Sequence, residues 1–229
     1  MVPETAVVIP GSVSWWEQTR NPPKGRGRPP IELARIVAAS LDVLDEGEAG
    51  DYSIRNVAAR LGSSTATLYR RVDGRPGLDA LIVDAILGEA LEESRQTPAG
   101  EWQVTLITIA TATFAALSRH PRAVPLVAAS VPSGPHAVAL RERAVECLLR
   151  EGFSPELAAR TYTSAGHYTV GFGLQLMYDP AGTEHVNLPP ASSRVASHLD
   201  ATLHDEFLFG LTMMLQGVDA SRRGGNGRV

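Results

Sequence analysis

Apolar residues recur at three- and four-residue steps over most of this chain, and no segment shows the strict alternation that is typical of a half-buried β-strand. The pattern begins at Ile31 and returns in successive segments separated by glycine, proline or aspartate. A chain of 229 residues, 44% of them hydrophobic, is long enough to bury a large core. We therefore predict an all-α fold, with helices over residues 31–46, 54–61, 64–72, 75–91, 101–118, 122–130, 135–150, 155–178, 192–203 and 205–218.

Several classes of protein are excluded by what the chain lacks. No run of eighteen or more residues is uninterruptedly apolar and the N-terminus does not have the layout of a secretory signal, so we expect a cytoplasmic protein without a membrane span. The single cysteine, Cys147, cannot form an internal disulfide or a thiolate zinc cluster. The motifs of hydrolases, zinc proteases and P-loop enzymes are missing. We expect no metal, no cofactor and no enzymatic activity.

Charge is divided unevenly along the chain. Residues 20–75 hold ten basic and seven acidic side chains, or +3, and since the whole chain carries −4, the remainder carries −7. A basic N-terminal region joined to an acidic body is typical of a protein that binds nucleic acid through one end. Arginine supplies twenty of the 21 basic residues, which suits phosphate and guanine contacts, although a GC-rich genome would produce the same bias.

Residues 1–30 contain six of the sixteen prolines and no apolar period. This composition predicts a flexible, extended basic arm. Trp15 and Trp16 are exceptions, because a tryptophan pair is costly to leave in water. We expect the pair to pack against the body, with contact to a partner as the alternative.

Two short predicted helices meet at a tight turn around Gly62, an arrangement that places the second helix in the major groove of DNA. At 100° per residue, with Leu68 and Val72 facing inward, the outward side of this helix carries Ala66, Thr67 and Arg70, with Tyr69 and Arg71 at its edges. Arginine can bind guanine, threonine and alanine methyl groups can contact thymine, and tyrosine can bind phosphate. A solvated helix with a few arginines is the alternative.

These residues also carry a family resemblance. Segment 52–81, YSIRNVAARLGSSTATLYRRVDGRPGLDAL, resembles the helix-turn-helix domain of the tetracycline-repressor (TetR) family in its Leu61-Gly62, Thr67-Leu68-Tyr69 and Leu78-Asp79-Ala80-Leu81 motifs. The resemblance implies DNA contacts by Arg55, Thr65, Thr67, Tyr69, Arg70 and Arg71, and a phosphate contact by Arg75. Gly77 departs from the pattern, because glycine lowers helix propensity inside the predicted fourth helix.

A second candidate for DNA contact lies in the arm. Residues 24–30, KGRGRPP, resemble the core of an AT-hook, in which extended arginines enter a narrow minor groove. Arg26 and Arg28 would be the inserted residues. The alternative is a basic tail that attracts phosphates without reading sequence. In both cases we expect removal of residues 1–29 to weaken operator binding.

The predicted helices at 101–118 and 155–178 are apolar around most of their circumference, so each must be covered on more than one side. A symmetric dimer would cover them and would also pair two recognition helices. The last helix carries one apolar stripe, formed by Phe207, Leu211, Met214, Leu215 and Val218. The closing segment DEFLFGLTMMLQGV resembles that of the TetR subgroup that contains the tetracycline repressor itself, which implies pairing through the last two long helices.

The same resemblance implies a small molecule held between the middle helices. Candidate ligand contacts are residues of mixed polarity on apolar faces, namely Trp102, Thr105, Ile109, Thr113, Phe114, His167 and Gln175; ordinary core packing is the alternative for each. Ile109 and Thr113 stand where the tetracycline repressor reads a magnesium–drug chelate, so we expect neither tetracycline nor a bound metal. The apolar composition favours a lipophilic or aromatic effector. Arg141, Glu142 and Arg143 are interpreted as a solvated face.

Taken together, the sequence predicts a flexible arm (1–30), a helix-turn-helix DNA-binding domain (31–75), a connecting helix (76–91) and a ligand-binding and dimerisation domain (92–222). The predicted function is a homodimeric transcriptional regulator, most simply a repressor that binds a palindromic operator and is released by a small-molecule inducer. An architectural DNA-binding protein that ignores ligands is the main alternative, and an enzyme built on the helical body is a third.

Overall fold

A computed structural model of the chain describes residues 8–20, 31–47, 51–98, 100–177 and 201–224. The described residues form α-helices and one short 3-10 turn, which confirms the all-α prediction. The elements are α1 (Val13–Arg20), α2 (Leu33–Glu46), α3 (Ile54–Arg60), α4 (Thr65–Val72), α5 (Gly74–Arg95), α6 (Trp102–Arg119), the 3-10 turn η1 (Pro121–Ala123), α7 (Val124–Ala128), α8 (Pro135–Arg150), α9 (Pro155–Gln175) and α11 (Leu203–Gly224). Most of the predicted helix at 192–203 lies outside the described residues.

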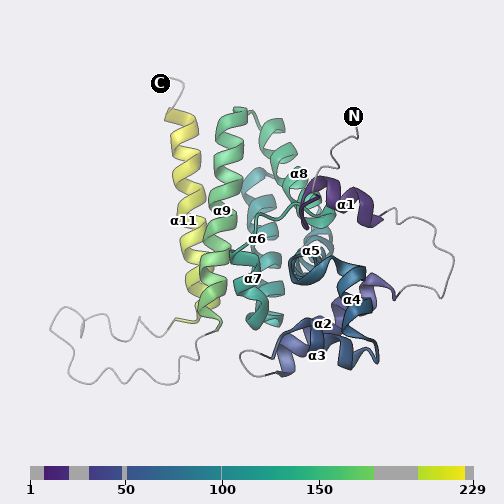
Figure 1. Cartoon of the computed structure of the whole chain (residues 1–229). Helices are drawn as coiled ribbons and strands as arrows, with labels where there is room; N and C mark the ends of the chain where they lie inside the picture. The colour runs from purple at the N-terminus through teal and green to yellow at the C-terminus, as the bar shows by residue number, and fades with distance from the viewer. Residues whose placement is uncertain (1–7, 21–30, 48–50, 99, 178–200, 225–229) are drawn as a thin grey trace, which may run out of the picture.

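Helices α2, α3 and α4 gather at one end of the molecule, and α9 and α11 lie side by side along the opposite flank, with α5 to α8 between them (Figure 1). Side-chain caps mark the start of both short helices of this unit. The Ser53 hydroxyl accepts the Asn56 N–H at 3.2 Å, and the Ser64 hydroxyl accepts the Thr67 N–H at 3.1 Å. Gly62, at φ +62, takes the left-handed conformation that the tight turn requires.

The helix-turn-helix unit is attached to the body by α5 and by polar contacts around His120. The Nδ1 atom of His120 lies 2.9 Å from Asp45 at the end of α2, and its Nε2 atom lies 3.1 Å from Glu89 on α5. Arg119 adds ion pairs to Glu89 and Glu93 at 2.9 and 3.2 Å. The orientation of the helix-turn-helix unit is therefore fixed against both α5 and α6.

The prediction of an extended arm is wrong for residues 13–20, which form α1. Trp15 and Trp16 are only 2% and 6% exposed, which confirms that the pair packs against the body. Burying two indole rings stabilises a helix that the surrounding proline-rich composition does not favour. Residues 1–7 and 21–30, with Arg26 and Arg28, lie outside the described residues.

None of the described helices combines the length and the hydrophobicity that crossing a bilayer requires.

Candidate DNA-binding surface and ligand cavity

The side of α4 that the helical period predicted to face outward does so. Leu68 and Val72 are completely buried, whereas Thr65, Thr67 and Arg70 are exposed and Tyr69 is 57% exposed. Arg71 is half-buried at the edge, as predicted, and its Nε atom donates to the carbonyl oxygen of Ile31 at 3.1 Å. Arg55 is exposed on α3. Four polar or basic side chains of α4 are thus available to a ligand outside the chain.

Arg75 takes part in a network at the start of α5. Its Nε atom donates to Asp79 Oδ1 at 2.7 Å, its Nη1 atom donates to the carbonyl oxygen of Tyr52 at 2.9 Å, and its guanidinium lies 3.8 Å from the centre of the Tyr52 ring. The Tyr52 hydroxyl also donates to Asp79, at 2.6 Å. Burial, followed by the Asp79 carboxylate, raises the pKa of Tyr52, so the phenol remains a donor. Arg75 therefore holds α5 against the segment before α3, and its proposed phosphate contact would be made by a side chain already oriented.

A cavity of about 590 Å³ lies between α5, α6, α8, α9 and the segment around α7. Its lining is mainly apolar, with Leu87, Leu106, Leu140 and Val170 among its walls. Three of the predicted ligand contacts, Ile109, Thr113 and His167, line it. A volume of this size suits a drug-sized organic molecule.

The four other candidates do not line this cavity. Trp102 is buried against Phe153, with ring centroids 4.9 Å apart, and Thr105 is buried beside Cys147, whose Sγ lies 3.4 Å from its hydroxyl. Phe114 stacks on Phe207 at 4.6 Å, and Gln175 is exposed near the end of α9. The first three are ordinary packed core, which was the alternative interpretation of their apolar surroundings.

Two lining residues with ionisable side chains, Tyr162 and Arg141, were not among the candidates. Tyr162 lines the cavity, and burial raises the pKa of its phenol, an effect that the positive charge of Arg141 partly offsets. Arg141 is itself a lining residue, so its interpretation as part of a solvated face is incomplete. That interpretation is wrong for Arg143, which donates to the carbonyl oxygens of Ser94 and Thr97 at 3.1 and 2.8 Å. The signal for Arg141 was helical phase, since Ala137, Leu140 and Val145 share its face of α8 and also line the cavity.

The apolar stripe of the last helix packs within its own chain. Phe207, Leu211 and Leu215 are at most 1% exposed. The ring of Phe207 also stacks on that of Tyr168 of α9, with ring centroids 5.7 Å apart. The outer side of α11 instead exposes Phe209 (69%) and Met213 (46%). The helix predicted to dimerise thus has apolar residues on two sides, and a different set from the one expected faces outward.

Comparisons with known proteins agree on one family. The sequence profile described as "Tetracyclin repressor-like, C-terminal domain" matches residues 94–222. The HTH-type transcriptional repressor DrrR1 of Streptomyces coeruleorubidus is 29% identical over 238 residues, covering 91% of this chain and 86% of that protein. Tetracycline repressor protein class G of Vibrio anguillarum is 24% identical over 201 residues, covering 84% of this chain and 95% of that protein.

Solved structures show the same fold. Apo ActR from Streptomyces coelicolor superposes with a TM-score of 0.75 at 23% identity, and the match covers 87% of this chain and 100% of ActR. ActR in complex with actinorhodin has a TM-score of 0.72 at 24% identity, over 85% of this chain and 98% of that one. Because the family profile spans more than half of the sequence, this chain belongs to the tetracycline-repressor (TetR) family of transcriptional regulators.

Proposed function

We propose that the protein is a homodimeric, ligand-responsive repressor that acts in the cytoplasm, binds a palindromic operator through α4 and releases it when a small molecule enters the cavity. The observation that carries the proposal is the pairing, in one chain, of an outward-facing polar side on α4 with a largely apolar cavity of about 590 Å³ in the body. The relative DrrR1 is named a repressor, and ActR was crystallised with actinorhodin. Both relatives support the proposal.

On the DNA side, we assign base contacts to Thr67 and Arg70 and phosphate contacts to Arg55 and Tyr69, all of which are exposed. Arginine binds guanine with two parallel hydrogen bonds, and a threonine methyl group fits the methyl group of thymine. Thr65, Arg71 and Arg75 border this surface and would fix the orientation of α4 on the duplex. Arg60 is assigned no DNA contact, because Glu46 accepts two of its hydrogen bonds at 2.6 and 2.8 Å.

On the ligand side, we infer an aromatic compound that carries an acidic group. The apolar walls favour burial of a ring system, while Arg141 offers a cation at the lining. Tyr162, Thr113 and His167 supply hydrogen-bonding groups to the same space. A carboxylate or phenolate bound to Arg141 would place the ring system of the same compound among the leucines. Such a compound has one charged end and one apolar end, as the cavity lining does.

The dimer is inferred from the outer face of the last helix. Phe209 and Met213 are exposed apolar side chains on the side of α11 away from its packed stripe. Covering them with a second copy of the chain would remove this surface from water. A two-fold dimer would also pair two recognition helices, as a palindromic operator with half-sites about 34–36 Å apart requires.

Repression and release follow from linkage. A ligand that prefers a conformation in which the two α4 helices have the wrong spacing for DNA lowers the affinity for DNA. Because coupling between two sites is reciprocal, bound DNA lowers the affinity for the ligand by the same factor. Helix α5 joins the two sites, since it begins one residue after α4 ends and its Leu87 lines the cavity.

The DNA assignment is tested by selecting bound fragments from random DNA and measuring the affinity of variants for the selected sequence. Arg70→Ala should lose about 1–3 kcal/mol of specific binding. Arg150→Ala, which removes an exposed arginine at the end of α8, is the matched control and should bind like the wild type. Equal affinity of Arg70→Ala and wild type for specific and for random DNA would contradict the assignment.

The ligand assignment is tested by thermal-shift and calorimetric screening with aromatic carboxylic acids and hydroxyquinones. A binding compound should raise the melting temperature, weaken operator binding, and lose affinity about tenfold or more in Arg141→Gln, because a charge-assisted hydrogen bond is removed. The failure of every compound to stabilise the protein, combined with intact operator binding, would favour the ligand-independent architectural protein.

A further inference from the structure

Residues 8–20 form a docked N-terminal segment that runs from the body to the base of the recognition helix. The rings of Trp15 and Trp16 pack edge to face with centroids 4.8 Å apart, and both are buried. In Figure 1, α1 lies beside the helices of the body, apart from α2 and α3. The segment is therefore part of the folded core on the side where α4 joins α5.

One end of this segment contacts the α4–α5 junction. Trp15 donates from Nε1 to Asp73 Oδ2 at 2.7 Å. Asp73 is the single residue between α4 and α5, and at φ 54, ψ 45 it holds the left-handed conformation that turns one helix into the other. A Cβ atom on Gly77 would lie 3.0 Å from Cζ2 of Trp15, so the indole ring also lies against the first turn of α5. Trp15 thus contacts the hinge that sets the direction of α4.

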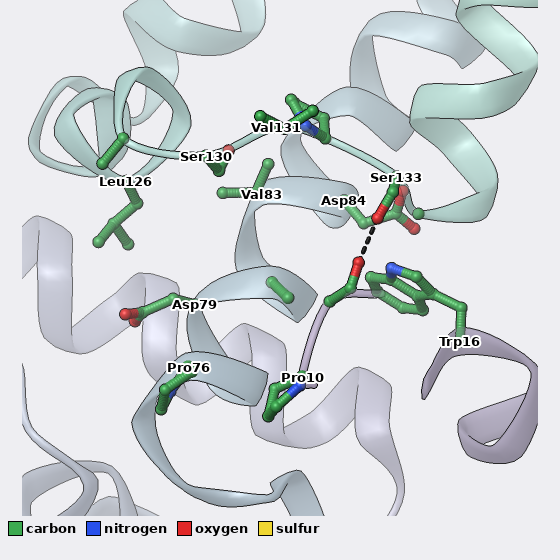
Figure 2. Close-up of a pocket in the computed structure, with 15 residues that line it drawn as sticks. Pro10, Trp16, Pro76, Asp79, Val83, Asp84, Leu126, Ser130, Val131 and Ser133 are labelled. Carbon is green, nitrogen blue, oxygen red and sulfur yellow. Dashed lines mark hydrogen bonds between the residues drawn. The ribbon is translucent and has the colours of Figure 1, made fainter. Parts of the chain in front are cut away.

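The other end of the segment contacts the loop between α7 and α8. The Ser133 hydroxyl donates to the carbonyl oxygen of Gly11, the hydrogen bond drawn above Trp16 in Figure 2. Gly11 takes a positive φ of 83°, which favours glycine, and a Cβ atom there would lie 3.3 Å from that of Ala80 on α5. The segment is thereby fixed to the loop at a position with little room for another residue.

That loop also forms part of the wall of the ligand cavity. Ser130, Val131 and Pro132 line the cavity of about 590 Å³, and the same three residues line a smaller cavity of about 330 Å³ that Pro10, Gly11 and Trp16 close from the other side (Figure 2). A ligand that displaces the loop in the first cavity must alter the packing of the N-terminal segment in the second. The series begins at Pro132 in the cavity wall, continues to the adjacent Ser133 and crosses to Gly11 by the hydrogen bond. It then follows the chain to Ser12, whose hydroxyl accepts the Trp15 N–H at 3.3 Å, and reaches Asp73 through the Trp15 ring.

We propose that the N-terminal segment positions the recognition helix from the cavity loop, with Trp15 and Ser133 as positioning residues that act on α4 through Asp73. This rests on the proposed function, because positioning matters only if α4 binds DNA. It supplies a non-covalent route between ligand and DNA that runs parallel to α5. The direction of α4 is then sensitive to the loop even where α5 itself does not bend.

The test uses hydrogen–deuterium exchange on the full chain without DNA, followed by operator affinity. Ser133→Ala removes the hydroxyl at the loop and should raise exchange about fivefold in residues 69–78, the factor that one hydrogen bond of ordinary net strength represents. Trp15→Phe removes the donor at the junction and should raise exchange in residues 130–137 by a similar factor. Each variant should also bind the selected operator more weakly than wild type.

Two controls separate positioning from loss of structure. Ser118→Ala removes a hydroxyl that donates to the Phe114 carbonyl on α6, outside this series of interactions, and should leave both regions unchanged. Ser133→Thr keeps the hydroxyl and should restore wild-type exchange. Exchange that rises only at the mutated end, or equally throughout α9, would overturn the proposal. If exchange couples the two ends but no DNA fragment is ever selected, the proposed function fails while the coupling stands.

Discussion

Gly77 gives the sharpest test of the packing at the α4–α5 junction, because helix propensity and structure predict opposite results. Replacing a glycine inside a helix by alanine stabilises it by about 1 kcal/mol when the site is open. At Gly77 a Cβ atom would lie 1.8 Å from the carbonyl oxygen of Val72, a backbone atom. Relieving that overlap requires a shift of more than an ångström in the junction, and overpacking of this kind costs about 1–3 kcal/mol.

We therefore expect Gly77→Ala to lower the free energy of unfolding by about 2 kcal/mol, taking the upper end of the overpacking cost less the gain in propensity. Urea unfolding followed by circular dichroism, at one protein concentration, measures the difference. Gly217→Ala on α11 is the matched control, since no atom lies within 4 Å of its added Cβ, and it should be neutral or stabilising. A Gly77→Ala protein as stable as the wild type would refute the geometry of this junction.

Three further predictions concern charge and assembly. Burial raises the pKa of Asp84, so the folded protein holds the carboxyl proton more tightly than the unfolded chain does. The free energy of unfolding should therefore fall as the pH rises above 3.8, the ordinary pKa of an aspartate. Urea unfolding over a pH series should show that this fall disappears in Asp84→Asn. Phe209→Asp should shift the dimer towards monomer in sedimentation measurements and weaken operator binding, because half-sites would be bound singly; an unchanged dimer would remove the outer face of α11 from the interface. Arg26→Ala with Arg28→Ala should lower the salt dependence of DNA binding by about 0.9 in log–log slope for each phosphate that the arm no longer neutralises. The double variant tests the arm more cleanly than removal of residues 1–29, which would also remove the bond from Trp15 to Asp73.

Sequence patterns predicted the helix-turn-helix unit well because short-range rules decide its structure. The turn at Gly62 and the inward positions of Leu68 and Val72 follow from spacing and local chemistry alone. Helix α1 was missed because its stabilisation is not local. Its key hydrogen bond joins residues 58 positions apart. The tryptophan pair indicated that this segment packs against the body, but not that it is helical or where it binds.

The cavity was predicted only in part, for a related reason. Helix α6 is apolar on most sides, so its period cannot distinguish Ile109, which lines the cavity, from Phe114, which packs against Phe207. Arg141 was obscured by its charged neighbours, although its phase on α8 matches that of the lining residues. Core and cavity have the same residue types, and only the arrangement of five helices decides which atoms are left without a packing partner.

The length of α5 would amplify a small change at the cavity into a displacement at the DNA-binding end that disrupts base contacts. The helix has 22 residues, so it is about 33 Å long, and a tilt of about 5° around its body end would move its DNA end by about 3 Å. Base-reading hydrogen bonds tolerate only about half an ångström, whereas attraction to phosphates changes little over the same displacement. In a two-fold dimer the two recognition helices move in opposite directions, which doubles the error in half-site spacing. An effector acting through α5 should therefore abolish specific binding long before it removes the salt-sensitive affinity for random DNA.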